Sequence, residues 1–256
     1  MAETERREPP VPGEAVRAAA AGEGLGRPRA SYGPRSRTGE IGARTMVVTV
    51  AGLVPLVIGL VSGELLWLVV GVPVAGVGVL GLLTNRTVDS HNAGMELHIF
   101  DNGLVVVVRG RAEHVFRWDS MTVLQEIISH RSYGGVLTHV YTLRKPGGGK
   151  VRIGREFHDP EVWGVHIQQS VTAARLPDAL RRLEAGEAVA FGPIEVTGEG
   201  IRDGRRHASW GEVEVRIEEG TLCVDVGRRA IVFRSVDGIP NLYLLLALTD
   251  HLTRTR

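Results

Sequence analysis

The chain has 256 residues, a formal net charge of +1 at pH 7 and 43% hydrophobic residues, enough for one or two domains with a hydrophobic core. All but two of its 30 basic residues are arginine, and 29 acidic residues balance them, which argues against a nucleic-acid-binding protein. Cys223 is the only cysteine. This excludes an intramolecular disulfide and a cysteine-based zinc site, and we expect a buried thiol.

Residues 1–44 are rich in Pro, Gly, Ala, Arg and Glu and show no sustained apolar period, which predicts a disordered tail. A GxGxG pattern, Gly22 to Gly26, lies within this segment. A phosphate-binding turn needs a preceding strand to orient its backbone amides, and the sequence predicts no strand before Gly22. We therefore do not interpret these glycines as a nucleotide site.

Two uncharged runs follow, one on each side of Glu64. They predict a transmembrane hairpin over residues 45–85, with spans at 46–62 and 65–84. A helix rises about 1.5 Å per residue, so the first span covers about 26 Å of a hydrocarbon core about 30 Å thick. Ser62, Gly63 and Glu64 form the predicted turn, and Trp67 is placed as an interfacial aromatic residue.

Two other interpretations of these runs are less economical. A cleaved signal peptide would need a charged region of more than 40 residues before its apolar part. A soluble domain would have to surround two wholly apolar helices with the short remaining chain, so lipid is the better solvent for them.

Arginine placement predicts the orientation of the hairpin. Arginines precede the first span, Arg86 follows the second, and the connecting turn has neither Lys nor Arg. By the positive-inside rule both ends should be cytoplasmic, in a multi-pass protein of the plasma membrane. The preceding arginines are Arg27, Arg29, Arg35, Arg37 and Arg44.

After a linker at 87–94 the pattern changes to short alternating strands, which predict an antiparallel meander over residues 94–187. Asp101-Asn102-Gly103 should supply positive-φ residues for a hairpin, and Pro146 to Gly149 should supply another. The Gly-rich run ending at Lys150 lies between strands, so it is not a phosphate loop. A helix opens at Pro160, and a second short helix is expected from Pro177 to Ala185.

The same order recurs over residues 190–256, which predicts a second, smaller copy of one meander-plus-helix unit. The spacing between markers is shorter in this copy, so longer hairpins are expected in the first, around His130 to Gly135. The markers of the repeat, in matching order, are Gly103, Trp118 and Pro160 in the first copy and Gly200, Trp210 and Pro240 in the second.

With its apolar hairpin, its Asp-Asn-Gly-Leu turn and its Arg117-Trp118-Asp119 and Ser209-Trp210-Gly211 segments, the chain resembles bacterial membrane proteins with pleckstrin-homology-like domains. The Phe191-Gly192 joint and the Ile-Pro-Asn helix start add to this likeness. It is similar to an uncharacterised actinobacterial family of such proteins. The resemblance implies an α+β fold of tandem, partly open β-barrel units, each closed by a C-terminal helix.

The sequence offers no grouping typical of an enzyme. The nine histidines are scattered, and no pair has the i, i+4 spacing of a metal clamp on one helix. No nucleophile lies beside an evident base, so we expect neither catalysis, nor a metal, nor a cofactor.

Basic residues at predicted turns are the candidates for contact with a partner or with anionic lipid. A basic side chain near an anionic leaflet contributes about 1 kcal/mol. Residues 94–256 carry as many acidic as basic side chains, however, so no large positive face is guaranteed. The candidates are Arg202, Arg205, Arg206, Arg228 and Arg229 in the second copy and Arg144, Lys145 and Lys150 in the first.

These patterns lead to one functional hypothesis and two alternatives. We expect a membrane-tethered, non-catalytic scaffold that binds a protein partner, using the sheets and the seam between the copies near Phe191. A sensor of anionic lipid or envelope state, reading headgroups through the arginine loops, is the first alternative. An accessory subunit of an enzyme or transporter is the second, because two spans without internal charge cannot form a solute path alone.

Overall fold

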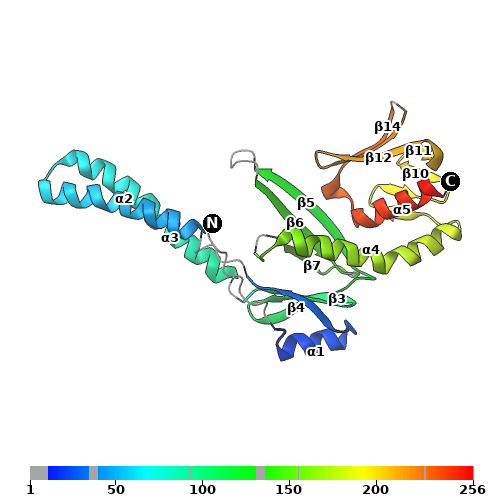
Figure 1. Ribbon diagram of the computed structural model, residues 1–256, viewed down its shortest axis with the longest axis horizontal. Coiled ribbons are helices and arrows are strands. Elements are labelled where there is room, and N and C mark those ends of the chain that lie inside the picture. Colours follow the sequence, from blue (N-terminus) through cyan, green and yellow to red (C-terminus); the bar gives the residue numbers. More distant parts are fainter. Residues whose placement is uncertain are drawn as a thin grey trace. The chain divides into compact units, whose positions relative to one another are not determined.

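The chain forms two compact units, one of which is inserted into the other in sequence. The computed structural model describes residues 11–34, 40–92, 94–130, 136–154, 156–227 and 229–255. One unit is a helical hairpin over Pro34–Met95, and the other is an α+β body formed by Met1–Gly33 and Glu96–Arg256 (Figure 1).

The hairpin consists of α2, Glu40–Ser62, and α3, Leu65–Asn92, which pack along each other. The two helices include the predicted spans 46–62 and 65–84 but extend beyond them, and each contains an internal proline, Pro55 or Pro73. Within the described residues, one helical segment, Thr45–Ser62, is long and apolar enough to cross a membrane. The corresponding apolar part of α3, Leu65–Gly81, is shorter.

In the first half of the body, a four-stranded sheet, a three-stranded sheet and a helix follow one another, and all strand pairs are antiparallel. The first sheet has the order β1-β2-β3-β4 and the second the order β5-β6-β7. The elements are β1 Pro28–Tyr32, β2 Glu96–Phe100, β3 Gly103–Val108, β4 Arg111–Arg117, β5 Thr122–His130, β6 Val136–Arg144, β7 Lys150–Ile153 and α4 Pro160–Glu184.

The second half has the same order of elements, a four-stranded sheet, a three-stranded sheet and a helix. Its sheets run β11-β10-β9-β8 and β12-β13-β14, and none of the four sheets of the described chain closes into a barrel. The elements are β8 Val189–Phe191, β9 Ile194–Val196, β10 Gly200–Asp203, β11 Arg206–Ser209, the 3-10 turn η2 Trp210–Glu212, β12 Val213–Glu218, β13 Thr221–Val226, β14 Arg229–Ser235, the 3-10 turn η3 Val236–Gly238 and α5 Leu242–Arg254.

The helical hairpin occupies the connection between the first two strands of the first copy. In the second copy, β8 and β9 are joined by Gly192 and Pro193 alone. In the first copy, the matching strands β1 and β2 are joined by the whole helical hairpin. The hairpin is therefore an insertion into the first turn of the first copy, and not a segment that precedes it.

The N-terminal segment corrects one expectation. Residues 14–32 were predicted to be part of a disordered tail, but they form α1, Glu14–Gly22, and β1. Helix α1 covers the outer face of the first sheet, where Val16, Ala20 and Leu25 pack against Phe100 and Val105. Residues 1–10 and 35–39 of the predicted tail lie outside the described residues, as do Arg35 and Arg37.

Two of the three repeat markers occupy equivalent places. The indole nitrogens of Trp118 and Trp210 donate to carbonyls of the preceding hairpin turn, Asp101 at 3.1 Å and Thr197 at 3.0 Å. A Cβ on Gly103 would lie 2.1 Å from the Phe116 oxygen, and one on Gly200 would lie 2.1 Å from the Ala208 oxygen. Close backbone approach therefore requires both glycines.

The other turn and marker expectations were partly wrong. Neither Asn102 nor Gly103 has a positive φ, whereas Gly147 and Gly148 do. Pro160 is the first residue of α4, but Pro240 precedes the N-cap of α5, so the equivalent positions are the left-handed N-cap residues Asp159 and Asn241. The longer hairpin expected near His130 to Gly135 falls largely on residues 131–135, outside the described chain.

Helix α4 joins the two copies as one element. A second helix was expected from Pro177, but α4 continues through this proline to Glu184. Its first half buries Trp163, which makes edge contacts with Tyr141 and Phe157 at centroid distances of 5.2 and 6.2 Å. Its second half buries Ala179 and Leu183 in the core of the second copy. Packing at both ends therefore outweighs the hydrogen bond lost at Pro177.

A second link between the copies is polar and buried. The Val123 amide of β5 donates to the Asn241 side-chain oxygen at 2.8 Å, and the Asn241 amide donates to the Val123 carbonyl at 2.8 Å. The seam therefore lies along β5, α4, η3 and α5. Phe191, near which the seam was expected, is instead buried in the core of the second copy.

We predict that Asn241→Ala weakens this seam by about 1–3 kcal/mol, because it leaves the buried Val123 amide without an acceptor. Thermal unfolding of the full chain and deuterium exchange at the Val123 amide will measure the effect. Asn241→Asp keeps the acceptor and should retain most of the protection. Equal exchange at Val123 in the two variants would contradict the prediction.

Candidate binding surfaces

The interior of the helical hairpin is formed by small residues. A Cβ on Gly52 would lie 2.3 Å from the Ala75 amide nitrogen, and one on Gly78 would lie 2.4 Å from the Thr49 hydroxyl oxygen. On Gly71 it would lie 2.5 Å from the Leu56 nitrogen. The two backbones are therefore in close contact, as in membrane helices that pack through small residues.

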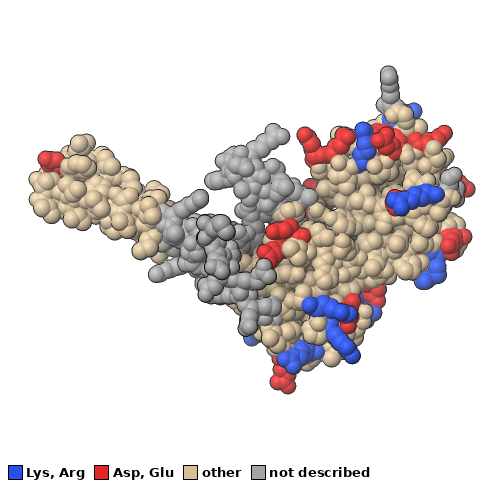
Figure 2. All heavy atoms as spheres, viewed as in Figure 1, with Lys and Arg blue, Asp and Glu red and all other residues tan. Residues whose placement is uncertain are grey.

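The outer surface of the same hairpin is formed by large aliphatic side chains. Away from the contact between the two helices most described residues are exposed, and among the described side chains of the hairpin in Figure 2 the charged one lies at the turn. The hairpin thus carries small residues inside and large apolar ones outside, which is the reverse of a water-soluble hairpin. The exposed residues include Val47, Val50, Leu53, Val54, Val57, Ile58, Leu60, Leu65, Leu66, Val69, Val72, Val77, Leu80 and Leu83.

In the first copy the structure brings the predicted basic residues together. Arg144 and Lys150 are cross-strand partners at the ends of β6 and β7, and Lys145 lies in the turn between them. The Lys145 ammonium lies 5.4 Å from the centroid of the Phe116 ring, an aromatic contact that orients it.

In the second copy the predicted basic residues are dispersed. Arg202 forms an ion pair with Glu195 on the neighbouring strand, while Arg205 and Arg206 lie at the turn from β10 to β11. Asp203, beside this turn, pairs with Arg234 at 2.9 Å. Arg229 lies five residues before Arg234 on β14, which is roughly 16 Å along a strand. Arg228 lies outside the described residues.

One basic turn, Arg109-Gly110-Arg111 between β3 and β4, was not among the contact residues predicted from the sequence. In an antiparallel meander this turn lies at the same end of the sheet as the end of β1 and the start of β2. The chain leaves for the hairpin and returns from it at this end. Arg109 and Arg111 are both exposed. Both arginines could be recognised in the sequence. That their turn lies at the end of the sheet where the chain leaves β1 could not be, because β1 was not predicted as a strand.

A buried histidine links the two strands between which the hairpin is inserted. The Ser31 hydroxyl of β1 lies 2.8 Å from Nδ1 of His98 on β2, and Nε2 of His98 lies 2.8 Å from a Glu96 carboxylate oxygen. Burial lowers the pKa of His98, although the hydrogen bond to the Glu96 carboxylate opposes the shift. The imidazole is fully buried, so this hydroxyl, imidazole and carboxylate hold the strands together and do not form an accessible catalytic group.

The Asp101-Asn102 turn holds the N-terminal segment in place. Asp101 accepts a hydrogen bond from the Arg27 amide at 2.9 Å and forms an ion pair with Arg29. The hydrogen bond from the Arg27 amide is the largest cause that holds the pKa of Asp101 below its usual value, and the hydrogen bond from the Arg29 side chain is the next. The Asn102 amide donates to the Leu25 carbonyl at 2.8 Å. These carboxylate contacts are structural, and no group of three metal-ligating side chains occurs in the parts of the chain that the structure describes.

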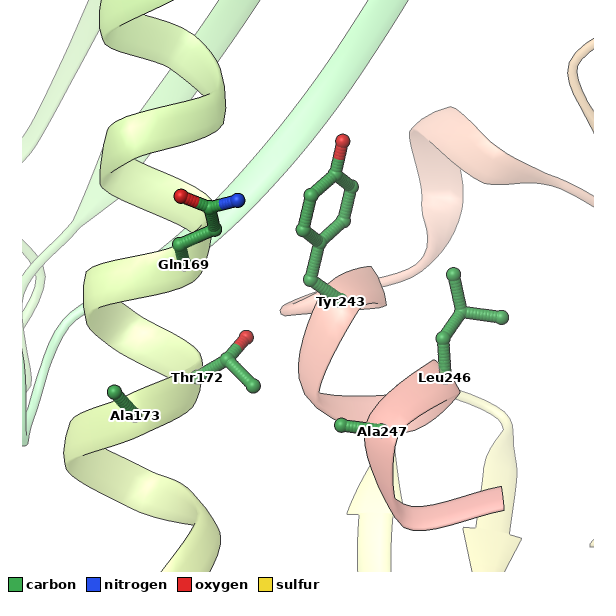
Figure 3. A pocket seen from close by; sticks show the side chains of 6 residues that line it. All are labelled: Gln169, Thr172, Ala173, Tyr243, Leu246 and Ala247. Atoms are coloured by element: carbon green, nitrogen blue, oxygen red, sulfur yellow. The ribbon is translucent and has the colours of Figure 1, made fainter. Parts of the chain in front are cut away.

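An apolar groove runs between α4 and α5. Its volume is about 380 Å³, and Figure 3 shows Gln169 and Thr172 of α4 facing Tyr243 and Ala247 of α5 across it. Ala173 and Leu246 complete the lining. The groove offers few polar groups, so it suits an apolar contact better than it suits a polar small molecule.

The described chain is therefore an α+β protein with two copies of one unit of antiparallel sheets and a helix, into which an apolar hairpin is inserted. It belongs to a family of unknown function (DUF6585), whose model matches residues 1–256. No curated protein and no solved structure matches the chain.

We predict that Gly78→Leu separates α2 from α3, because its side chain would occupy the position of the Thr49 backbone. Gly76→Leu is the matched control on the same helix, since a Cβ there meets nothing within 4 Å. Spin labels at Leu53 and Val77 of the full chain will report the separation. The same distance in both variants would show that small residues do not determine the packing.

Proposed function

We propose that the protein is a membrane-tethered, non-catalytic binding protein whose hairpin crosses the bilayer twice and whose two α+β copies are pleckstrin-homology-like and cytoplasmic. The observation that carries this proposal is the distribution of side chains in the hairpin, with small residues inside and large aliphatic residues exposed outside. Water would strongly disfavour such a surface, while hydrocarbon would not.

The order of elements supports the pleckstrin-homology-like part of the proposal. Each copy has a four-stranded sheet, a three-stranded sheet and a terminal helix, and in each copy the indole nitrogen of a tryptophan donates to a carbonyl of the preceding hairpin turn. In such units, function lies on loops, strand edges and helix flanks. We therefore expect a protein partner to bind the body while the hairpin keeps the body at the membrane.

The position of the hairpin supports tethering in a defined orientation. Because it is inserted between β1 and β2, two chain connections link the first copy to the bilayer, and both leave from the same end of the sheet. A domain held at two neighbouring strands has less rotational freedom than one held by a single linker.

We predict that the full chain stays in the membrane fraction after alkaline carbonate washing and that Val57→Asp weakens this retention. A charge near the centre of a span costs about 2.5–3.5 kcal/mol on insertion scales. Arg202→Asp, a charge change in the body, is the control. Complete release of the wild-type protein by carbonate would contradict the proposal.

The orientation generates a separate prediction. In intact cells, an impermeant maleimide should label a cysteine at Glu64, in the turn between the helices. A cysteine at Glu199, in an exposed turn of the body, should be labelled only after lysis. Labelling of Glu199→Cys in intact cells would contradict the cytoplasmic placement of the body.

A second candidate function is contact with anionic lipid headgroups, favoured by the placement of Arg109 and Arg111 at the end of the sheet from which the hairpin leaves. Each basic side chain near an anionic leaflet contributes about 1 kcal/mol. Contact with lipid headgroups is therefore proposed for Arg109 and Arg111, in place of the dispersed arginines of the second copy.

We predict that an environment-sensitive dye on Gly110→Cys reports a less polar setting in nanodiscs with anionic lipid than in zwitterionic ones. Arg109→Ala with Arg111→Ala should remove the difference. Arg205→Ala with Arg206→Ala should leave it unchanged. A signal independent of lipid charge would exclude headgroup contact at this turn.

A further inference from the structure

Strand β12 is an edge of its sheet, with β13 on one side and no strand of the described chain on the other. Alternate backbone amides and carbonyls of an edge strand point away from the sheet and can pair with another chain. A groove of about 390 Å³ runs between this edge and α5. Its lining is Val213, Glu214 and Val215 from β12 and Leu246, Thr249, Asp250 and Thr253 from α5.

The first copy shows what covers the equivalent edge. Its counterpart β5 is also an edge strand, but η3 of the second copy lies along it, and Asn241 exchanges two hydrogen bonds with Val123. Thus a short segment of main chain, together with one side-chain acceptor, satisfies the backbone of β5. Among the described residues, β12 pairs with β13 alone, and no other strand lies beside its free edge.

The exposure of matching side chains also differs between the copies, since Gln125 is buried where it accepts a hydrogen bond from Gln168 of α4 at 3.0 Å. When Trp118 is aligned with Trp210, Gln125 corresponds to Ile217, and Met121 and Val123 correspond to Val213 and Val215. Gln125 is 7% exposed, whereas Ile217 is 46% exposed. Met121 and Val123 are fully buried, while Val213 and Val215 remain half-buried. The edge of β12 therefore presents an apolar strip where the edge of β5 has none.

The charge around this strip is negative. Glu212, Glu214 and Glu218 are exposed on or beside β12. Asp250 borders the groove from α5, where it pairs with Arg254 at 2.9 Å, so the carboxylates without an ion pair are Glu212 and Glu214 among the described residues of this surface. Arg216 is the basic residue of the strand, and it already pairs with Asp225 and Glu218. A strand added to this edge would meet complementary charge if it carried basic residues.

We propose that the edge of β12 and the adjoining flank of α5 bind an extended segment of a partner protein, in which apolar residues alternate with basic ones. The segment extends the β12-β13-β14 sheet by one strand and places its apolar side chains beside Val213, Val215 and Ile217. This inference rests on the proposed function, since it names the surface and chemistry of the expected protein partner.

The charge disfavours a second copy of this chain as the occupant. In antiparallel pairing of β12 with β12 centred on Arg216, Glu214 of each copy would lie opposite Glu218 of the other, and like charges across strands are destabilising. Arg216, which could offset them, already pairs with Asp225. The α4–α5 groove lacks both a free strand edge and a charged rim, so it does not select a strand.

The test is selection of 12-residue peptides from a random display library on the full chain in nanodiscs. Enriched peptides should alternate apolar with Lys or Arg, and a synthetic version should slow deuterium exchange in Val213–Glu218. Glu214→Lys with Ile217→Lys should weaken its binding at least tenfold. The matched control, Glu199→Lys with Phe233→Lys, makes the same charge change elsewhere on the second copy and should alter binding less than twofold.

Several results would overturn the inference: no enriched peptide, protection confined to the α4–α5 groove, self-association through β12, or equal binding by the variant and its control. Crosslinking in cells separates this inference from the proposed function. A partner retained equally by the wild type and the β12 variant would leave the proposed function standing and remove β12 as its site. Release of the protein by carbonate would instead contradict the tethering itself.

Discussion

The pairing of β1 with β2 is the constraint on which the rest of the architecture depends. Neighbouring strands lie about 4.8 Å apart, so whatever joins these two must leave and return at nearly the same point. An antiparallel pair of helices meets this requirement when the helices pack closely, and Gly52, Gly71 and Gly78 permit that contact. His98 then joins the two strands directly through Ser31. The pairing of β1 with β2 and the close packing of α2 against α3 therefore depend on each other.

The two copies divide the available surface differently. In the first, α1 covers the outer face of the sheet, and η3 with Asn241 covers the edge of β5. In the second, the corresponding face and edge have no such cover among the described residues, and they carry Arg202, His207 and Ile217 in exposed or half-exposed positions. The second copy therefore leaves more of its sheet surface exposed than the first does among the described residues, as the proposed partner site requires.

Local patterns in the sequence were sufficient for some of these features. Strand alternation, the two tryptophans and the two glycines predicted the repeated order of elements, because each depends on residues near it in the chain. The uncharged runs around Glu64 predicted two helices. The basic turn at Lys145 could likewise be located from the sequence alone.

Features that depend on distant partners could not be predicted in this way. Strand β1 contains Pro28 and is stabilised by residues such as Asp101 and His98, which lie 67 or more positions away. Continuation of α4 through Pro177 depends on packing against the second copy, and local rules favour a break there. The roles proposed for Arg109 and for the β12 edge rest on topology, and a single copy viewed alone does not indicate them.

The position of the hairpin between β1 and β2 also determines when the first sheet can form during synthesis. Strand β1 emerges from the ribosome before the hairpin, and its partner β2 emerges after it, so the first sheet cannot be completed until both helices have been made. In the proposed topology the hairpin must enter the bilayer and return before β1 can meet β2. Failure of either helix to insert would separate the strands and leave Leu25, Phe100 and Val105 uncovered, an apolar surface of the kind that chaperones and proteases bind. Correct membrane insertion and correct folding of the body would then be a single, mutually dependent outcome.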